Sequence, residues 1–295
     1  MRYPRITLVA FAGLALARPL EPRQLSAPQF WSQKECLDAH EPQPSAASAP
    51  QPPPAKLEPQ QSLPKIVYRG SSKSPEEIRT AGGFIPRDNG PITNETFGLS
   101  SHHGGQWRTF YTSTTRSFGI ALGFSVGYPD VGYFDGEPRG GWVYRIHPTP
   151  NIIDLANSGI TFSYDDEEEF SALGGVRYDQ IEAWMPMPKN ITGRDLTEAD
   201  ILKFHDFENF AKEFPDRKWT DNVDYNHKYD SLSASPGQPQ LSGDRDNLAK
   251  FNDKTLEQHA IEFMKKNGKA VGWTGTFPLS SLTSGKTSAP NNVDH

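Results

Sequence analysis

The sequence of 295 residues has little that would cross-link or anchor it: one cysteine, no long apolar run and no excess of basic charge. With Cys36 alone, an internal disulfide is excluded, so stability has to come from a hydrophobic core. Cys36 is either a free thiol or a link to another chain. The formal net charge of -6 leaves no basic stripe that could displace counterions from a phosphate backbone, so we expect no nucleic-acid partner.

The longest apolar run stands at the amino terminus. Arg2 and Arg5 precede the apolar residues 6–17, which end in an Ala-Leu-Ala triplet of the kind that signal peptidases cleave. The run is shorter than the roughly 20 residues needed to span a bilayer, and Arg18-Pro19 argues against the alternative of a buried helix. We expect a signal peptide over residues 1–17, a secreted protein and no stable membrane insertion.

Residues 18–64 are dominated towards their end by Pro, Ala, Ser and Gln, which cannot build a core. This composition predicts a largely disordered pro-segment or linker. Two triplets, at Asn94 and Asn190, match the glycosylation sequon and would have to lie at the surface if modified.

The globular part opens with a β-branched and aromatic run at residues 65–70, which predicts a strand with Arg69 at its end. A short helix follows, with Ser74 as N-cap, Pro75 in its first turn and Glu77 completing a capping box. Residues 87–108 read as loop, 110–114 as a strand and 117–126 as a helix.

Later segments are short and varied. We expect strands at residues 142–146, at 151–155, within 176–187 and at 270–279, and helices at residues 197–214 and 255–266. Strands and helices alternate without the regular rhythm of a parallel sheet, so the predicted fold class is α+β.

Three features carry candidate chemistry: Arg69 at a strand end, Ser113 in a Thr-Ser-Thr strand, and the acidic run of residues 165–169 followed by Phe-Ser-Ala-Leu-Gly-Gly. Each has an ordinary alternative as a surface residue, a solvated strand face or a solvated turn. The acidic run could also hold calcium in a secreted binding module, although its spacing is poor for a known calcium loop.

Taken together and in order, these features resemble the A chains of cholera toxin and heat-labile enterotoxin, ADP-ribosyltransferases of the Arg/Ser-Thr-Ser/Glu-x-Glu class. The match extends over about 120 residues and is densest after the acidic run, at residues 171–175 and then at Tyr178, Gln180-Ile181 and Trp184. The resemblance implies a cleft between two roughly perpendicular antiparallel sheets, NAD+ as the consumed co-substrate and no metal. Residues 65–188 would form the catalytic core, and residues 189–295 a packed extension.

The resemblance also implies roles for individual residues. Arg69 would hold NAD+ through its guanidinium fork, with Arg87 as a further contact, and Ser113 would orient Glu169 by a hydrogen bond. Glu169 would bind the 2′-hydroxyl of the nicotinamide ribose and stabilise the positive charge that develops as the glycosidic bond breaks.

Glu167 would be the first acid of Glu-x-Glu, which in this class accompanies an arginine acceptor. If the run is extended, Glu167 and Glu169 point to one side and Glu168 points away. The pair Asp166 and Glu168 has the same spacing, but the Phe-Ser-Ala-Leu-Gly-Gly anchor favours Glu167 and Glu169.

His102 falls near the position of a functional histidine in a mobile loop of the toxins, and the alternative is a solvated loop histidine. The region before Ser113 is about ten residues shorter here, so we expect altered loops over the cleft.

The predicted function is a secreted mono-ADP-ribosyltransferase toxin that modifies an arginine of a host protein, by resemblance a GTP-binding protein. NAD+ glycohydrolysis in the same cleft is the alternative. Since Cys36 precedes the domain, it cannot form the disulfide of the toxins' carboxyl-terminal tail, and the sequence predicts neither a delivery route nor an activating partner.

Overall fold

The computed structural model describes residues 62–86, 90–105, 108–127, 140–160, 168–189, 191, 196–243, 249–251 and 254–279. The predicted leader, Cys36, and the linker up to residue 61 lie outside the described residues, as do Arg87, Asn190 and Glu167. All described residues belong to one compact unit that begins at Pro59.

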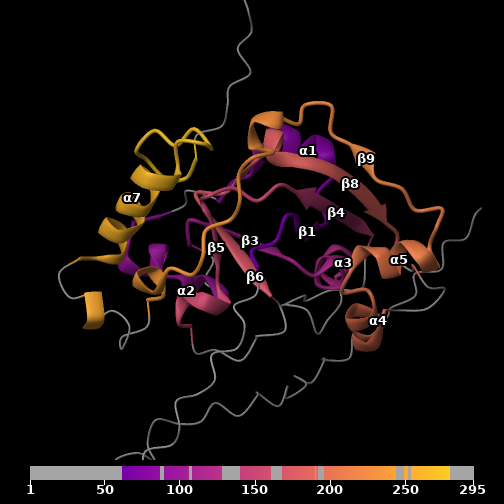
Figure 1. The fold of residues 1–295 in the computed structure, drawn as a ribbon, viewed down its shortest axis with the longest axis horizontal. Coiled ribbons are helices and arrows are strands. Elements are labelled where there is room, and N and C mark those ends of the chain that lie inside the picture. The colour runs from indigo at the N-terminus through magenta and orange to yellow at the C-terminus, as the bar shows by residue number, and fades with distance from the viewer. Residues whose placement is uncertain are drawn as a thin grey trace, which may run out of the picture. The chain divides into compact units, whose positions relative to one another are not determined.

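Antiparallel pairing organises the protein. Among the described residues, seven strands form one sheet in the order β5-β6-β3-β1-β4-β8-β9, whose strands are labelled in Figure 1. β2 pairs with β7 in a separate ribbon. The strands are β1 Val67–Ser71, β2 Gly83–Phe84, β3 Tyr111–Thr115, β4 Gly141–Ile146, β5 Ile152–Asp154, β6 Glu169–Leu173, β7 Val176–Arg177, β8 Ile181–Met187 and β9 Thr220–Asp221. All named strands pair antiparallel and helices are interspersed, so the predicted α+β class is confirmed.

The large sheet consists of two halves with a narrow junction. β1 pairs with β4 over five positions but with β3 only at Tyr68 and Thr115. The half β5-β6-β3 and the half β1-β4-β8-β9 are therefore joined at one pair of residues, at the carboxyl end of β3, and separate beyond Tyr68 along β1. The candidate site lies at this divergence.

The helices are short: α1 Pro75–Thr80, α2 Leu99–His103, α3 Phe118–Val126, α4 Glu198–Lys203, α5 Phe207–Glu213 and α7 Leu256–Asn267. Single 3-10 turns occupy η1 Asn94–Phe97, η2 Ala156–Ser158, η4 Tyr178–Gln180, η5 His227–Tyr229, η6 Pro239–Leu241 and η7 Ala249–Phe251. The predicted capping box of α1 is confirmed, since Glu77 N–H donates to the Ser74 hydroxyl and the Glu77 carboxylate accepts from the Ser74 N–H at 2.8 Å. None of the helices in the described ranges is both long and apolar enough to cross a membrane.

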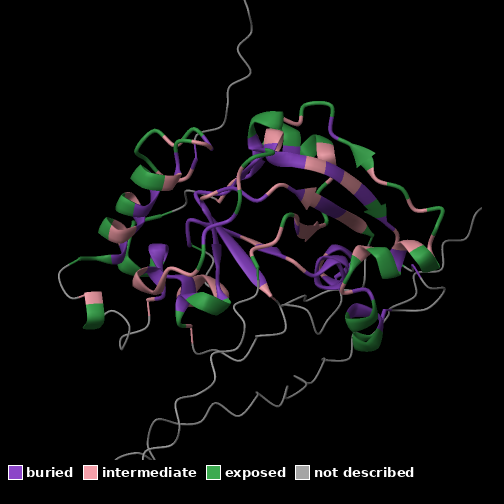
Figure 2. Ribbon diagram, in the orientation of Figure 1, coloured by how far each residue is buried: buried purple, intermediate pink, exposed green. Residues whose placement is uncertain are grey.

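Helix α3 packs directly on the backbone of β1 and β4, and Figure 2 shows it almost wholly buried. Two glycines make this close approach possible. A Cβ on Gly70 would lie 2.0 Å from the Ala121 carbonyl oxygen, and one on Gly141 would lie 2.1 Å from that of Ser125. The absence of side chains at these positions thus sets the distance between α3 and the sheet.

Gly70→Ala is expected to lower the free energy of unfolding by about 2–3 kcal/mol, because backbone atoms of α3 would have to move away from β1. Denaturant unfolding measures this change. Gly140→Ala is the matched control: its new Cβ would meet its nearest atom, the Met187 carbonyl oxygen, at 3.1 Å, so a loss under about 1 kcal/mol is expected. Equal losses in the two variants would contradict this account of α3 packing.

The carboxyl-terminal part contributes to the same core as the early strands. One buried cluster unites Phe97, Leu99 and Tyr111 with Leu256 of α7 and Leu279. Arg177 on β7 donates from its buried guanidinium to the carbonyls of Val271 and Gly272. Residues 254–279 are thus held by core contacts and by hydrogen bonds to the ribbon.

Three sequence expectations are wrong in detail. The stretch 87–108, expected as loop, contains η1 and α2. The expected helix over 197–214 is two helices, because His205 between them accepts the Phe118 N–H through its carbonyl and bonds Glu168 through its ring. The expected strand at 270–279 is a series of turns, because its carbonyls at Val271 and Gly272 bind Arg177 rather than another strand.

Candidate active site

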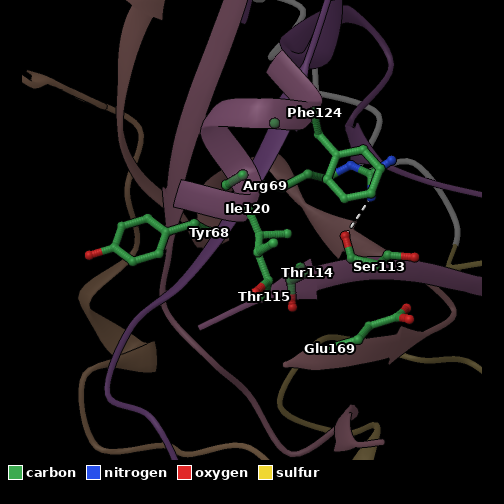
Figure 3. Close-up of a pocket in the computed structure, with 10 residues that line it drawn as sticks. Tyr68, Arg69, Ser113, Thr114, Thr115, Ile120, Phe124 and Glu169 are labelled. Atoms are coloured by element: carbon green, nitrogen blue, oxygen red, sulfur yellow. Dashed lines mark hydrogen bonds between the residues drawn. The ribbon is translucent and has the colours of Figure 1, made fainter. Parts of the chain in front are cut away.

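Neighbouring strands bring three of the predicted residues together. Arg69 comes from β1, Ser113 from β3 and Glu169 from β6, and these strands lie side by side in the sheet. All three residues line one pocket (Figure 3). Ser113 is in register with Ser171, so Glu169, two residues before Ser171, is its diagonal neighbour on the same face.

The pocket is closed on one side by α3, whose Ile120 and Phe124 line it together with Tyr68 of β1. Its empty volume is about 530 Å³, a figure that includes the open mouth. One wall is therefore apolar and aromatic, and the other carries the arginine and the carboxylate.

Arg69 crosses the gap where β1 and β3 diverge. Its Nη1 donates to the carbonyl of Ser113, and its guanidinium carbon lies 5.1 Å from the centre of the Phe84 ring. Burial lowers the pKa of Arg69 to about 10, against the opposing effect of Glu169, so the side chain stays protonated at neutral pH. Its Nε is buried and has no hydrogen-bond partner among the described residues.

Glu169 is buried, and both of its carboxylate oxygens have partners. Ser171 donates to Oε1 at 2.7 Å, and Nδ1 of His103 lies 2.8 Å from Oε2. Nε2 of His102 is 3.5 Å from Oε1. The carboxylate is thus fixed by side chains from β6 and α2.

The same neighbours keep Glu169 ionised. Burial alone would raise the pKa of Glu169, but the hydrogen bond from His103, the charge of His102 and the hydroxyls of Ser171 and Ser113 outweigh it and lower the pKa to about 2. At neutral pH the pocket therefore presents a carboxylate with a fixed orientation.

His102 supports Ser113 from behind the pocket. Nδ1 of His102 is 2.6 Å from the Thr109 hydroxyl, and Nε2 is 2.9 Å from the Ser113 hydroxyl. Burial lowers the pKa of His102. The charge of Glu169 opposes this decrease, and the charges of Arg69 and His103 add to it. The residue lies on helix α2 and not in a loop, which corrects the expectation from the sequence.

Glu168 does not line the pocket. Its carboxylate bonds Arg116 at 3.2 Å and His205 at 2.7 Å. Its backbone has φ 42°, in the left-handed region, and β6 begins only at the next residue. The expectation of an extended chain through the acidic run is therefore wrong at Glu168, and strand alternation does not determine how Glu167 is directed.

Two predicted site residues, Glu167 and Arg87, lie outside the described residues. In the part of the chain that the structure describes, no group of three or more His, Cys, Asp or Glu side chains is arranged to hold a metal ion. Most of the acidic run proposed as a calcium alternative also lies outside it.

The sequence interpretation missed two partners of Glu169. Ser171 could have been found, because strand spacing places it on the same face as Glu169. His103 had no such signal. It is 66 residues from Glu169 in the sequence, and no sequence pattern distinguishes it from the adjacent His102 as the partner of Glu169.

Comparison with known proteins shows the family of the chain. A family model described as the heat-labile enterotoxin alpha chain matches residues 57–274. The chain belongs to this family. The match includes every described residue of the pocket and continues through α7.

Curated relatives cover the chain only in part. An NAD(+)--arginine ADP-ribosyltransferase of Vibrio cholerae, Chelt, is 26% identical over 52% of this chain and 26% of its own length. Heat-labile enterotoxin IIA A chain of Escherichia coli is 30% identical over 40% of this chain and 47% of its own length. The A-subunit of cholera enterotoxin from Vibrio cholerae is 31% identical over 40% of this chain and 48% of its own length. The chain thus spans between a quarter and a half of the length of these relatives.

The chain is also similar to solved toxin structures. A point mutant of heat-labile enterotoxin is 24% identical with a TM-score of 0.43 and covers 65% of this chain and 96% of its own. Scabin toxin from Streptomyces scabies is 15% identical with a TM-score of 0.34, over 57% of this chain and 79% of its own.

Proposed function

We propose that the protein is a mono-ADP-ribosyltransferase that cleaves NAD+ and transfers ADP-ribose to an arginine side chain of a host protein. The observation that carries this proposal is the placement of Arg69 and Glu169 in one pocket, the first protonated and the second ionised. Membership in the enterotoxin family supports the same chemistry.

Arg69 would bind the diphosphate of NAD+. A guanidinium pairs with phosphate oxygens through two parallel hydrogen bonds, and the Nε of Arg69 is a buried donor without a described partner. A buried donor of this kind is costly unless a ligand oxygen accepts from it. The apolar wall of Ile120 and Phe124 would exclude water from the reacting bond.

Glu169 would act on the nicotinamide ribose. When the bond from C1′ to the nicotinamide nitrogen breaks, its electron pair leaves with neutral nicotinamide and positive charge develops on the ribose. A fixed carboxylate that accepts a hydrogen bond from the 2′-hydroxyl stabilises that charge. Ser171 and His103 hold the carboxylate beforehand, so little reorganisation is needed during the reaction.

The acceptor would be a guanidinium nitrogen, which forms the new bond to C1′ and loses one proton. Glu167 is the residue that we assign to orient this acceptor and take the proton, on the basis of the Glu-x-Glu pattern. With water in place of arginine, the same cleft would hydrolyse NAD+.

The test is to supply NAD+ with and without a small arginine analogue and to measure nicotinamide release and the ADP-ribosylated analogue separately. Glu167→Gln is expected to lower transfer at least about a hundredfold and to leave hydrolysis within about threefold, because only transfer needs the acceptor deprotonated. Equal losses of both activities would refute the assignment of Glu167 to the acceptor.

The acceptor protein and the compartment need their own measurements. Incubation with labelled NAD+ and host-cell lysate, followed by mass spectrometry, tests whether the modified residue is an arginine and whether the target is a GTP-binding protein. Secretion through the leader at residues 1–17 is the part of the route that the sequence supports, and action on a host protein would further require entry into the host cell.

A further inference from the structure

Helix α2 carries two adjacent histidines that bind different strands. His102 bonds Ser113 on β3, whereas His103 bonds Glu169 on β6. Successive side chains of a helix point about 100° apart, so the two adjacent histidines can bond residues of two neighbouring strands. Little of either side chain is exposed, 12% for His102 and 6% for His103.

The amino-terminal end of α2 is fixed in place by contacts outside the pocket. The Ser100 N–H donates to the Ser242 carbonyl at 2.7 Å, and the Leu99 side chain is fully buried. His103 is therefore presented to Glu169 by an anchored helix, and its ring has little freedom to leave the carboxylate.

We infer that His103 is a positioning residue for NAD+ cleavage: its Nδ1 holds Oε2 of Glu169 while Ser171 holds Oε1. This inference rests on the proposed function. A carboxylate accepts about four hydrogen bonds, so these two donors fix its plane and leave capacity for the ribose 2′-hydroxyl. Without His103, Oε2 would lose this hydrogen bond, and the carboxylate would be held mainly by Ser171 at Oε1.

The charged and polar groups that face Glu169 come from four elements: Arg69 from β1, Ser113 from β3, Ser171 from β6, and both histidines from α2. Of these, His103 supplies the largest effect that favours the ionised carboxylate. Without it, burial is opposed less strongly, so the pKa of Glu169 rises and the acid side of the kcat profile moves to higher pH.

The test compares His103→Ala with His103→Asn. The alanine variant is expected to lose about 10- to 100-fold in kcat with the KM for NAD+ within about threefold, and its acid limb is expected to move up by about one pH unit. The amide nitrogen of asparagine lies near the position of the histidine Nδ1. The asparagine variant is therefore expected to have kcat and an acid limb near the wild-type values. His227→Ala is the matched control, since His227 is an exposed histidine bonded to Asp230.

Two results would overturn the inference. One is an alanine variant with unchanged kcat and acid limb. The other is a lower kcat with an unmoved acid limb in both variants, which is what a purely structural role of His103 would give.

A titration without NAD+ separates this inference from the proposed function. Carbon-13 labelled glutamate carboxyls are titrated by NMR, and the Glu169 signal is assigned by its absence in Glu169→Gln. A higher pKa of Glu169 in His103→Ala than in wild type supports the contact, and an equal pKa refutes it. If the wild type fails to cleave NAD+, the proposed function is refuted while the titration still decides the role of His103 at the carboxylate.

Discussion

Replacing Glu169 with glutamine is expected to slow NAD+ cleavage by about a thousandfold or more. The substitution keeps the size of the side chain but removes the negative charge that stabilises the developing positive charge on the ribose. Because the charge acts in the transition state, kcat should fall while the affinity for NAD+ changes little. Nicotinamide release under saturating NAD+ measures the effect, and binding calorimetry measures the affinity.

Glu168→Gln is the matched control for this experiment. It changes the adjacent acid by the same single atom, but the Glu168 carboxylate contacts Arg116 and His205 rather than the pocket. We expect nicotinamide release within about threefold of wild type, since the substitution changes a contact outside the pocket. Turnover that persists in Glu169→Gln, or is lost only in Glu168→Gln, would show that the wrong acid of the run has been assigned.

Arg69→Lys is expected to weaken NAD+ binding by at least about tenfold and to lower kcat/KM by about a hundredfold. Lysine keeps the charge but presents its donors from a single nitrogen, so it lacks the planar fork in which one nitrogen bonds the Ser113 carbonyl and the others pair with two phosphate oxygens. Binding calorimetry and steady-state kinetics measure the two effects.

Arg145→Lys is the control for Arg69→Lys. Arg145 lies on β4 opposite Tyr68 and pairs with Glu182 at 2.9 Å, outside the pocket. We expect its kcat/KM to stay within about threefold of wild type, since the substitution leaves the NAD+ pocket unaltered. If both variants lose affinity to the same extent, loss of a buried or bridging arginine in general, rather than loss of the phosphate-binding fork, would explain the result.

Local sequence signals predict local structure well. The cap of α1 depends on Ser74, Pro75 and Glu77 within one turn, and its prediction is correct because every partner is a near neighbour. The helix expected over 197–214 fails for the opposite reason. His205 is held by Glu168 and by the Phe118 N–H, both far away in the sequence, and these contacts separate α4 from α5.

The candidate site divides in the same way. Arg69, Ser113 and Glu169 are predicted from the resemblance to the toxin A chains, and the structure places them in one pocket. His103 is not predicted, because its role depends on how α2 packs against β6. No periodicity in the sequence indicates this long-range contact. The divergence of β1 from β3, which the guanidinium of Arg69 crosses, is likewise beyond sequence reasoning.

The contact between α2 and Ser242 bears on which segments of the chain the proposed activity requires. A boundary at residue 188, which the resemblance suggests, would retain the strand residues of the pocket. It would remove Ser242, which accepts a hydrogen bond from α2, and Leu256 and Leu279, which share a buried cluster with Leu99 of α2. Such a fragment would hold Arg69 and Glu169 without the contacts that support α2 and its hydrogen bonds to Ser113 and Glu169. If the proposed function is correct, the unit needed for activity therefore includes residues beyond 188, and removing the segment after β8 would lower activity without removing a described pocket residue.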